Sequence, residues 1–165
     1  TLAGGDIRSL ALGDLRGEIG FVPQKGNLFS GTIASNLRFG NQGATDAQLK
    51  DAIEIAQASE FVQEKADGIE SPISQGGNNV SGGQKQRLSI ARAIAKNPQI
   101  YVFDDSFSAL DLKTDARLRH ALSERVKNKT VIIVAQRIST ILHADQILVL
   151  DEGRLVGKGT HAQLK

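Results

Sequence analysis

The chain has 165 residues, 40% of them apolar, which is enough to bury one hydrophobic core. It has no cysteine, which excludes a disulfide framework and a thiolate metal site. Its net charge is +2, with 20 basic residues interspersed among 18 acidic ones, so the composition excludes a nucleic-acid-binding surface. No run of residues has the character of a membrane span or a signal peptide.

The first predicted elements are a turn and a strand. The glycine-rich residues 4–6 predict a hairpin turn, with Ile7 and Leu10 as its apolar anchors. Residues 19–23 predict a strand that ends at its proline. Gln24 would therefore stand at the carboxyl-terminal edge of that strand.

Residues 45–61 predict a single helix. Thr45 is a suitable N-cap, and Gln48 completes a capping box with it. The apolar positions recur at helical spacing and are typical of core packing: Leu49, Ala52, Ile53, Ala56 and Phe61. A polar, glycine-containing loop follows at residues 74–79.

A second capped helix begins at Ser81, where Gln84 again completes a capping box. Gly82 and Gly83 carry no side chains in its first turn, so backbone N–H groups are free there. A helix start of this kind is suited to binding phosphate. The helix is predicted to run through residues 85–96 and to stop before a proline.

The next strand ends in two carboxylates. Residues 100–103 are β-branched and aromatic, as in a strand buried in a parallel sheet, and Asp104 and Asp105 follow. Open α/β sheets bind ligands at this end of their strands. A serine–glycine helix start and a strand ending in acids, joined by one helix, therefore predict a phosphate-binding site.

This stretch resembles the ATP-binding cassette (ABC) ATPases. Residues 80–84 match the family's LSGGQ signature with Val80 in place of leucine, residues 100–104 match its Walker B strand, and residues 108–111 match its D-loop. Residues 20–24 are similar to its Q-loop. The resemblance extends over nearly the whole chain and implies ATP and Mg²⁺ as ligands.

The resemblance also implies a role for each site residue. Gln24 and Asp104 would hold Mg²⁺, Asp104 through a water, and Gln24 would also contact the nucleotide. Asp105 would act as the catalytic base and Gln136 would stand near the γ-phosphate. The remaining residues would face a nucleotide held by a second ATP-binding domain, and they are Ser81, Gly82, Gly83, Gln84 and Asp111.

The C-terminal third predicts a helix over residues 112–126, a buried strand over residues 130–134 and a third strand over residues 146–150. Strands alternating with helices indicate a parallel α/β sheet. Residues 153–160 only superficially resemble a phosphate loop, because the spacing is one residue short. We interpret them as part of a terminal hairpin, followed by a surface residue, His161.

Two residues depart from the family pattern at one catalytic site. Asp105 stands where the family has glutamate, which draws the carboxylate back by one methylene, and Gln136 replaces the switch histidine. Proton transfer needs hydrogen-bond reach, and glutamine cannot carry a positive charge. The pair of changes resembles the degenerate half of a heterodimeric ABC exporter. Residues 28–37 resemble the exporter segment that borders the membrane domain.

We therefore expect an α/β fold: part of a RecA-like P-loop NTPase core, formed by residues 1–28 and 81–165, with an inserted α-helical subdomain at residues 29–80. No phosphate-binding Walker A loop and no methionine occur in these residues. The sequence is thus expected to be truncated before the Q-loop.

The predicted function is that of an exporter's nucleotide-binding domain at the cytoplasmic face of the cell membrane. Its expected partners are a membrane-spanning domain and a second, different ATP-binding domain, with no nucleic acid. Two alternatives stay open: a non-hydrolytic regulatory half of an ABC pair, and a soluble, non-transport ABC ATPase.

Overall fold

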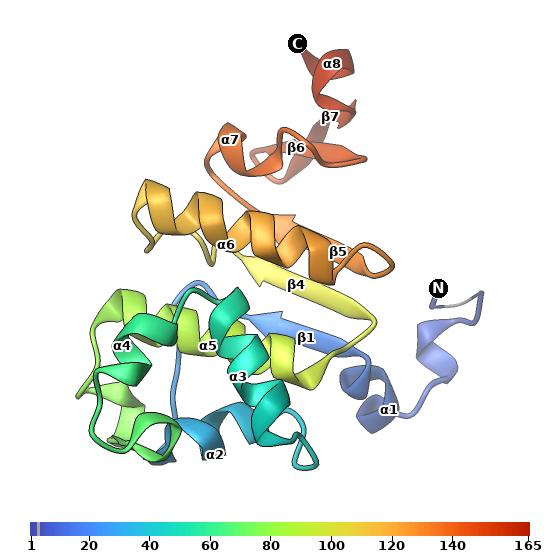
Figure 1. Cartoon of the computed structure of the whole chain (residues 1–165). Coiled ribbons are helices and arrows are strands. Elements are labelled where there is room, and N and C mark those ends of the chain that lie inside the picture. Colours follow the sequence, from blue (N-terminus) through green and yellow to red (C-terminus); the bar gives the residue numbers. More distant parts are fainter. Residues whose placement is uncertain (3) are drawn as a thin grey trace.

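The computed structural model describes residues 1–2 and 4–165, and its centre is a three-stranded parallel sheet (Figure 1). The strands are β1 (Ile19–Val22), β4 (Ile100–Asp104) and β5 (Thr130–Val134), in the order β1-β4-β5. The register continues across the sheet, with Ile19 opposite Ile100 and Ile100 opposite Thr130. This confirms the predicted α/β class, and the carboxyl ends of all three strands meet at one edge.

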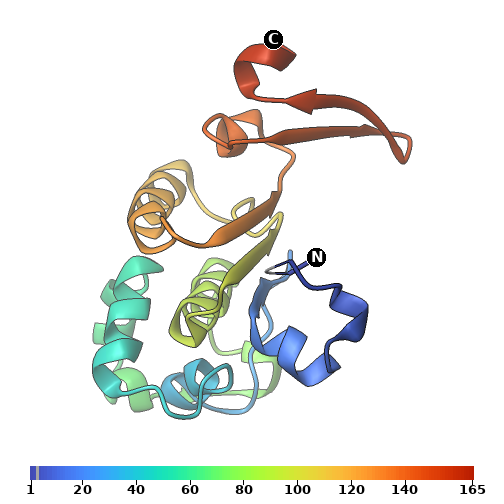
Figure 2. The same cartoon turned by 90° about the vertical axis from the view of Figure 1, so that its right-hand side faces the viewer.

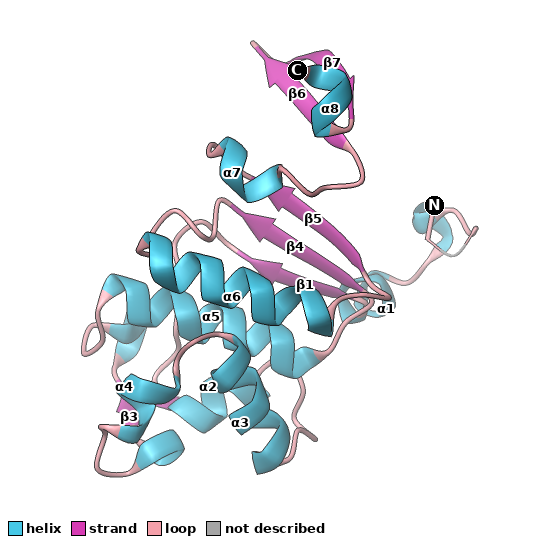
Figure 3. Ribbon diagram, turned by 45° about the horizontal axis from the view of Figure 1, so that its top comes forward, coloured by secondary structure: helices cyan, strands magenta, loops and turns pink. Residues whose placement is uncertain are grey.

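One face of this sheet is covered and the other is open. Helices α5 (Gly82–Lys96) and α6 (Leu112–Arg125) lie side by side on one face (Figures 2 and 3). The β4 side chains Tyr101 and Phe103 are fully buried. On β5, Ile132 and Val134 are about half exposed, at 50% and 52%. The prediction that β5 is a buried strand was therefore wrong. Val131 and Ile133 face the helices and are partly buried, whereas the alternate side chains point to a face that no element covers among the described residues.

The helices between β1 and α5 form a compact group beside α5 (Figure 1). They are α2 (Ile33–Arg38), α3 (Asp46–Ile55) and α4 (Ser59–Gln63). Short pieces complete the segment: strands β2 (Gly31–Thr32) and β3 (Pro72–Ile73), which pair antiparallel, and the 3₁₀ helices η2 (Gly68–Glu70) and η3 (Gln75–Gly77).

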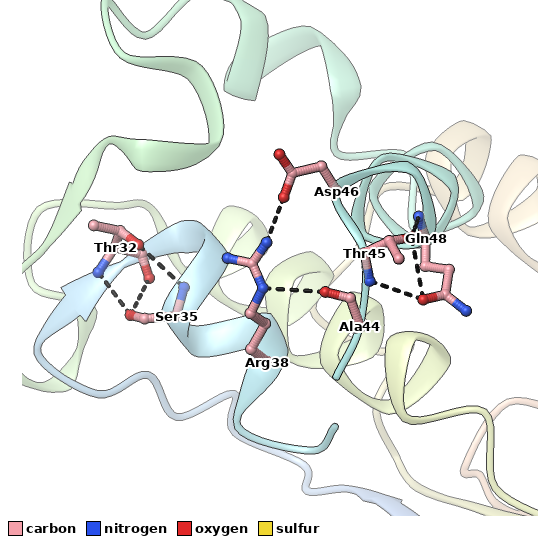
Figure 4. A network of polar contacts seen from close by, with 7 residues as sticks. All are labelled: Thr32, Ser35, Arg38, Ala44, Thr45, Asp46 and Gln48. Atoms are coloured by element: carbon pink, nitrogen blue, oxygen red, sulfur yellow. Dashed lines mark hydrogen bonds and ion pairs between the residues drawn. The ribbon is translucent and has the colours of Figure 1, made fainter. Parts of the chain in front are cut away.

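Capping residues fix where these short helices begin (Figure 4). The Thr45 hydroxyl accepts from the N–H of Gln48, whose side chain accepts from the Thr45 N–H, as predicted. Arg38, at the end of α2, donates to the Ala44 carbonyl at 3.2 Å and pairs with Asp46 in the first turn of α3. The two helices are thereby joined at their adjoining ends.

The single helix predicted over residues 45–61 is two helices, and this prediction was wrong. The chain leaves the helix at Gln57, whose φ of 55° is left-handed, and the Ala58 N–H donates back to Ile53 at 2.9 Å. The Gln57 carbonyl accepts from Arg87 of α5 at 2.7 Å. A contact from 30 residues away thus stabilises the break, which explains why local periodicity did not show it.

Helix α5 agrees with its prediction at both ends. Ser81 and Gln84 form a reciprocal capping box. At the other end, Asn97 is left-handed, with φ 51°, and Pro98 follows. Because proline disfavours helical backbone in the residue before it, the helix stops here and β4 can begin two residues later.

The C-terminal strands form a separate hairpin instead of joining the parallel sheet. Strands β6 (Ile147–Asp151) and β7 (Arg154–Gly159) pair antiparallel across a turn at Glu152 and Gly153, both at positive φ. The predicted terminal hairpin is confirmed, but the strand over residues 146–150 is not a third parallel strand. The short helices α7 (Ile138–Ile141) and α8 (His161–Leu164) flank the hairpin.

The N-terminal residues differ from the predicted hairpin. Leu2 and Gly5 form only an isolated bridge, and the chain continues into η1 (Ile7–Ser9) and α1 (Leu12–Gly17). Ile7 and Leu10 are exposed, so they are not the buried anchors of a turn. In the part of the chain that the structure describes, no helix is long and apolar enough to cross a membrane.

Candidate functional site

The carboxyl edge of the parallel sheet brings together residues that lie far apart in the sequence. Gln24 follows β1 after one proline, Asp104 ends β4, and Asp105 comes next. The Gln24 amide nitrogen Nε2 lies 3.3 Å from Asp105 Oδ2 and donates to it. Gln24 is exposed, while both aspartates are half-buried. The structure thus brings Gln24 and the two aspartates together at one edge of the sheet, and the Gln24–Asp105 contact is an observation that the sequence did not predict.

The backbone around Asp105 is held by several hydrogen bonds. Asp105 has φ 44°, a left-handed conformation that Asp tolerates better than most residues. Its N–H donates to Val134 of β5 at 2.8 Å, and its carbonyl accepts from Ser108 Oγ at 2.8 Å. The buried Ser106 hydroxyl donates to Val22 of β1 at 2.8 Å. The Asp105 position is thus tied to both neighbouring strands.

Gln136 reaches the same edge from the third strand. It lies in the exposed loop two residues after β5, next to α7. Its neighbour Arg137 donates to the Ser108 carbonyl at 3.2 Å, which ties this loop to the segment that follows β4. The three strands therefore deliver Gln24, Asp105 and Gln136 to one edge, although no side-chain bond holds Gln136 there among the described residues.

The second group of predicted residues lies at the starts of α5 and α6. Ser81 and Gly82 are exposed, and an added Cβ on Gly82 would meet no atom within 4 Å. Gly83 faces the Ala109 carbonyl, 3.8 Å from the position of a Cβ. The first turn of α5 therefore presents open backbone next to residues 108–111.

Asp111 is the N-cap of α6. Its carboxylate accepts from the N–H groups of Lys113 and Thr114 at 3.1 and 2.9 Å. The Thr114 side chain above all, and then the Thr114 and Lys113 N–H groups, lower the pKa of the Asp111 carboxyl below its usual value. Asp111 is therefore an anion with a clear structural role, whatever else it contacts.

Two residues that sequence reasoning missed lie behind Gln24. Gln86 of α5 is buried and hydrogen-bonds the backbone on both sides of Gln24, and Gly26 packs against α5. The sequence does contain a signal for Gln86. At helical spacing, three, four, seven and eight residues after it, come the buried residues Ser89, Ile90, Ala93 and Ile94, which places Gln86 on the core face of the helix.

The donor set fits Mg²⁺ in part. Carboxylate and amide oxygens are the ligands that Mg²⁺ prefers, and Asp104 and Gln24 provide one of each. Among residues 1–2 and 4–165, no cluster of three or more His, Cys, Asp or Glu side chains could hold a metal. This is compatible with Mg²⁺, which usually keeps several waters and binds nucleotide phosphates alongside one or two protein ligands.

Comparison with known proteins identifies the family. The ABC transporter family model matches residues 1–108, about two thirds of the chain. The chain belongs to the ABC transporter family. This confirms the resemblance of the sequence to ABC ATP-binding domains, a family of ATPases, and with it the expectation of an ATP-binding domain.

Individual relatives of this ABC domain include exporters. It is 48% identical over 162 residues to an uncharacterised ABC transporter ATP-binding protein of Mycobacterium tuberculosis, covering 96% of the chain and 28% of that protein. It is 45% identical over 161 residues to a β-(1→2)glucan export ATP-binding/permease protein of Rhodopseudomonas palustris, covering 98% and 27%.

A solved structure shows the same fold. An ATP-bound bacterial Atm1-family ABC exporter superposes with a TM-score of 0.92 at 38% identity, over 98% of this chain and 28% of that one. The chain therefore spans less than a third of the length of the relatives it matches. These comparisons support the exporter type of ABC domain and leave the site residues as predictions.

Proposed function

We propose that this chain is the ATP-binding domain of an ABC exporter in which binding and hydrolysis of ATP drive transport across a membrane. The observation that carries the proposal is the Gln24–Asp105 hydrogen bond at the carboxyl edge of the sheet, together with the open start of α5. Mg²⁺, when bound, would neutralise phosphate charge. Asp104 and Gln24 are the residues that would hold it.

The chain's own catalytic edge is proposed to be weak. Asp105 would orient and deprotonate the attacking water, but its carboxylate is one methylene shorter than the family's glutamate. An error near 1 Å in such a group can cost on the order of 100-fold in rate. Gln136 would donate a hydrogen bond to the γ-phosphate without the positive charge that histidine can carry.

The start of α5 is proposed to be fully able to bind the phosphates of a nucleotide held by a second ATP-binding domain. Ser81 and the N–H groups of Gly82 and Gly83 would contact the phosphates of a nucleotide held by a second ATP-binding domain, which Gln84 supports by completing the cap. Asp111 would lie across that interface. We infer that the partner is a different chain, because two changes at one edge and none at these two glycines fit a division of labour between unlike halves.

The membrane-spanning partner is proposed to contact the α2 side of residues 29–80, the segment we propose as the helical subdomain. A shallow groove of about 380 Å³ lies there, lined by Thr32, Ser35, Arg38, Phe39, Gln42 and Glu70. The exposed rings of Phe29 and Phe39 lie 4.5 Å apart beside it. An apolar pair flanked by charged groups suits a short amphipathic helix.

ATPase measurement on the full-length protein tests the proposal. The protein should hydrolyse ATP slowly alone and rapidly once combined with its unlike partner. Rapid turnover by the protein alone would show that the heterodimer assignment is wrong. Tight ATP binding with no turnover from this chain's site in any combination would favour the second candidate, a non-hydrolytic regulatory half, which the Asp105 and Gln136 changes also support.

A further inference from the structure

Gln86 holds the backbone on both sides of Gln24. Its side chain is 1% exposed, and both of its polar atoms are used. Oε1 accepts from the Gly26 N–H at 2.7 Å, and Nε2 donates to the Pro23 carbonyl at 3.1 Å. Pro23 and Gly26 enclose Gln24 and Lys25, so one amide from α5 closes the loop that carries Gln24.

The loop also lies directly on the helix backbone. A Cβ at Gly26 would come within 2.9 Å of the Lys85 carbonyl and 3.0 Å of Gln86 Cα. A third contact, at 2.9 Å, would be with the Ser89 hydroxyl oxygen. The Lys85 and Gln86 contacts are with backbone atoms, which cannot move aside without bending α5. Because Gly26 has no side chain, the loop can pack closely on the first two turns of α5, the helix that Ser81 caps.

This packing connects two regions that are proposed to contact nucleotide, the Gln24 loop and the start of α5. At one end, Gln24 contacts Asp105 at the strand edge. At the other, the unbroken helix α5 runs from its capped start to Lys96 with a buried core face. Burial makes the two Gln86 hydrogen bonds costly to break without replacement, since the freed Pro23 and Gly26 groups would be left unpaired.

We propose that Gln86 is a positioning residue that fastens the Gln24 loop to α5, so that the loop and residues 81–83 respond to nucleotide as one unit. This rests on the proposed function, because it takes both ends to be nucleotide contacts. Energetic coupling between sites passes through such chains of packed and hydrogen-bonded groups on a rigid element. Gln86 touches no nucleotide itself.

Hydrogen exchange on the full-length transporter, titrated with Mg-ATP, tests this. In the wild-type protein, the peptides covering residues 23–28 and 79–84 should gain protection at the same ATP concentration. Gln86→Leu removes both hydrogen bonds at similar volume. Exchange at Gly26 should then rise by at least about tenfold without ATP, while the core of α5 keeps its protection.

The response to ATP distinguishes coupling between the Gln24 loop and residues 81–83 from a merely stabilising role of Gln86. In Gln86→Leu, the ATP midpoints for the two segments should differ by about fivefold or more, whereas a general loss of stability would shift both together. Gln86→Glu keeps the Gly26 acceptor but turns a carboxylate oxygen towards the Pro23 carbonyl. In this variant the ATP midpoints of the two segments should also differ, but by less than in Gln86→Leu. If Gln86→Leu does not fold, Gln86→Glu provides the test of coupling.

Ser89→Ala is the matched control. Ser89 lies one turn later on the same buried face, and its hydroxyl oxygen packs on the same loop, 2.9 Å from the position of a Cβ at Gly26, but it makes no hydrogen bond in the structure. Ser89→Ala therefore changes a side chain under the loop without removing a hydrogen bond. This variant should behave as wild type. Unchanged Gly26 exchange, or equal midpoints, in the Gln86 variants would overturn the proposal. Loss of the ATP response in wild-type protein, with fast Gly26 exchange still seen in Gln86→Leu, would instead overturn the proposed function.

Discussion

The strand edge and the start of α5 are both proposed to face nucleotide, yet they are built differently. At the strand edge, the proposed function depends on side chains. Gln24, Asp105 and Gln136 reach this edge from three strands, and their lengths and charges would decide what they can do. At the start of α5, the working groups are backbone N–H groups positioned by the Ser81 cap.

This difference would explain how the strand edge could be weakened, as we propose, while the start of α5 is kept. Asp105 can differ from the family pattern without changing the backbone that carries it, because strand pairing and buried Ser106 hold that backbone. Gln136 lies in an exposed loop, where a changed side chain disturbs no packing. At the start of α5, a charged side chain at Gly82 would stand next to the N–H groups that are proposed to bind phosphate. Four variants, with their controls, test this contrast, beginning with the one expected to have the largest effect.

Gly82→Asp should abolish turnover by the full-length pair, with a loss of at least about 100-fold. The carboxylate would stand against the phosphates that the free N–H groups are proposed to bind. The structure predicts that the variant folds, because a Cβ at Gly82 meets no atom within 4 Å and acids are favourable in a first helical turn. Steady-state ATPase should therefore be lost while the melting temperature stays close to that of the wild-type protein.

Gly82→Ala is the control for bulk without charge. It should retain a substantial part of the turnover, since the methyl group leaves the helix start uncharged. Near wild-type ATPase in Gly82→Asp would show that the start of α5 does not face nucleotide, and the contrast drawn above would fail.

Restoring the family residues at the strand edge should have the next largest effect. Asp105→Glu combined with Gln136→His should raise hydrolysis at this chain's own site, by up to about tenfold for a recovered general base and phosphate contact. Single-turnover ATPase with the partner's site inactivated measures this. Because glutamate is less suited than aspartate to the left-handed backbone at this position, a small fall in melting temperature should accompany the gain.

No gain in the double variant, with folding intact, would mean that something other than these two side chains limits the site. The single variants serve as controls. Gln136→His alone should do less than the pair, since a phosphate contact without a well-placed base leaves the attacking water poorly oriented.

How far the sequence predicts this arrangement depends on the range of the interactions. The caps at Thr45 and Ser81 were predicted correctly because each is a contact between residues three apart. The break at Gln57 was missed because Arg87, from another helix, stabilises it. The same reason hides the Gln86 contacts with Pro23 and Gly26, which span 63 and 60 residues.

The sheet shows the same limit from another side. The apolar run 130–134 predicts a strand correctly but not its surroundings, because exposure of Ile132 and Val134 depends on which elements lie over that face. The strand over residues 146–150 was likewise found, but its partner is β7 and not β5. Pairing between strands, unlike strand formation, is not encoded in one short run.

Ser81→Ala should have a moderate effect. Losing the cap costs about 1 kcal/mol of helix stability and lets the first turn of α5 fray. Turnover of the pair should fall several-fold, and the melting temperature should fall with it. Ser81→Asp provides the control: it keeps a capping oxygen and should restore the melting temperature, but its added charge should still impair turnover.

Asp105→Asn should have the smallest effect, and it tests the contrast most directly. Asparagine tolerates the left-handed backbone at this position as aspartate does, and its Oδ1 can still accept from Gln24 Nε2. The backbone bonds from Asp105 to Val134 and from Ser108 to Asp105 are unaffected, so the fold should be retained. What is lost is the negative charge that could take a proton from water. If this chain's own site is already slow, total steady-state turnover of the pair should stay within about twofold of wild type, while single-turnover hydrolysis at this site falls further. Abolished steady-state turnover would show instead that Asp105 is the working base of a fully active site, and the assignment of this chain as the weak half would be wrong.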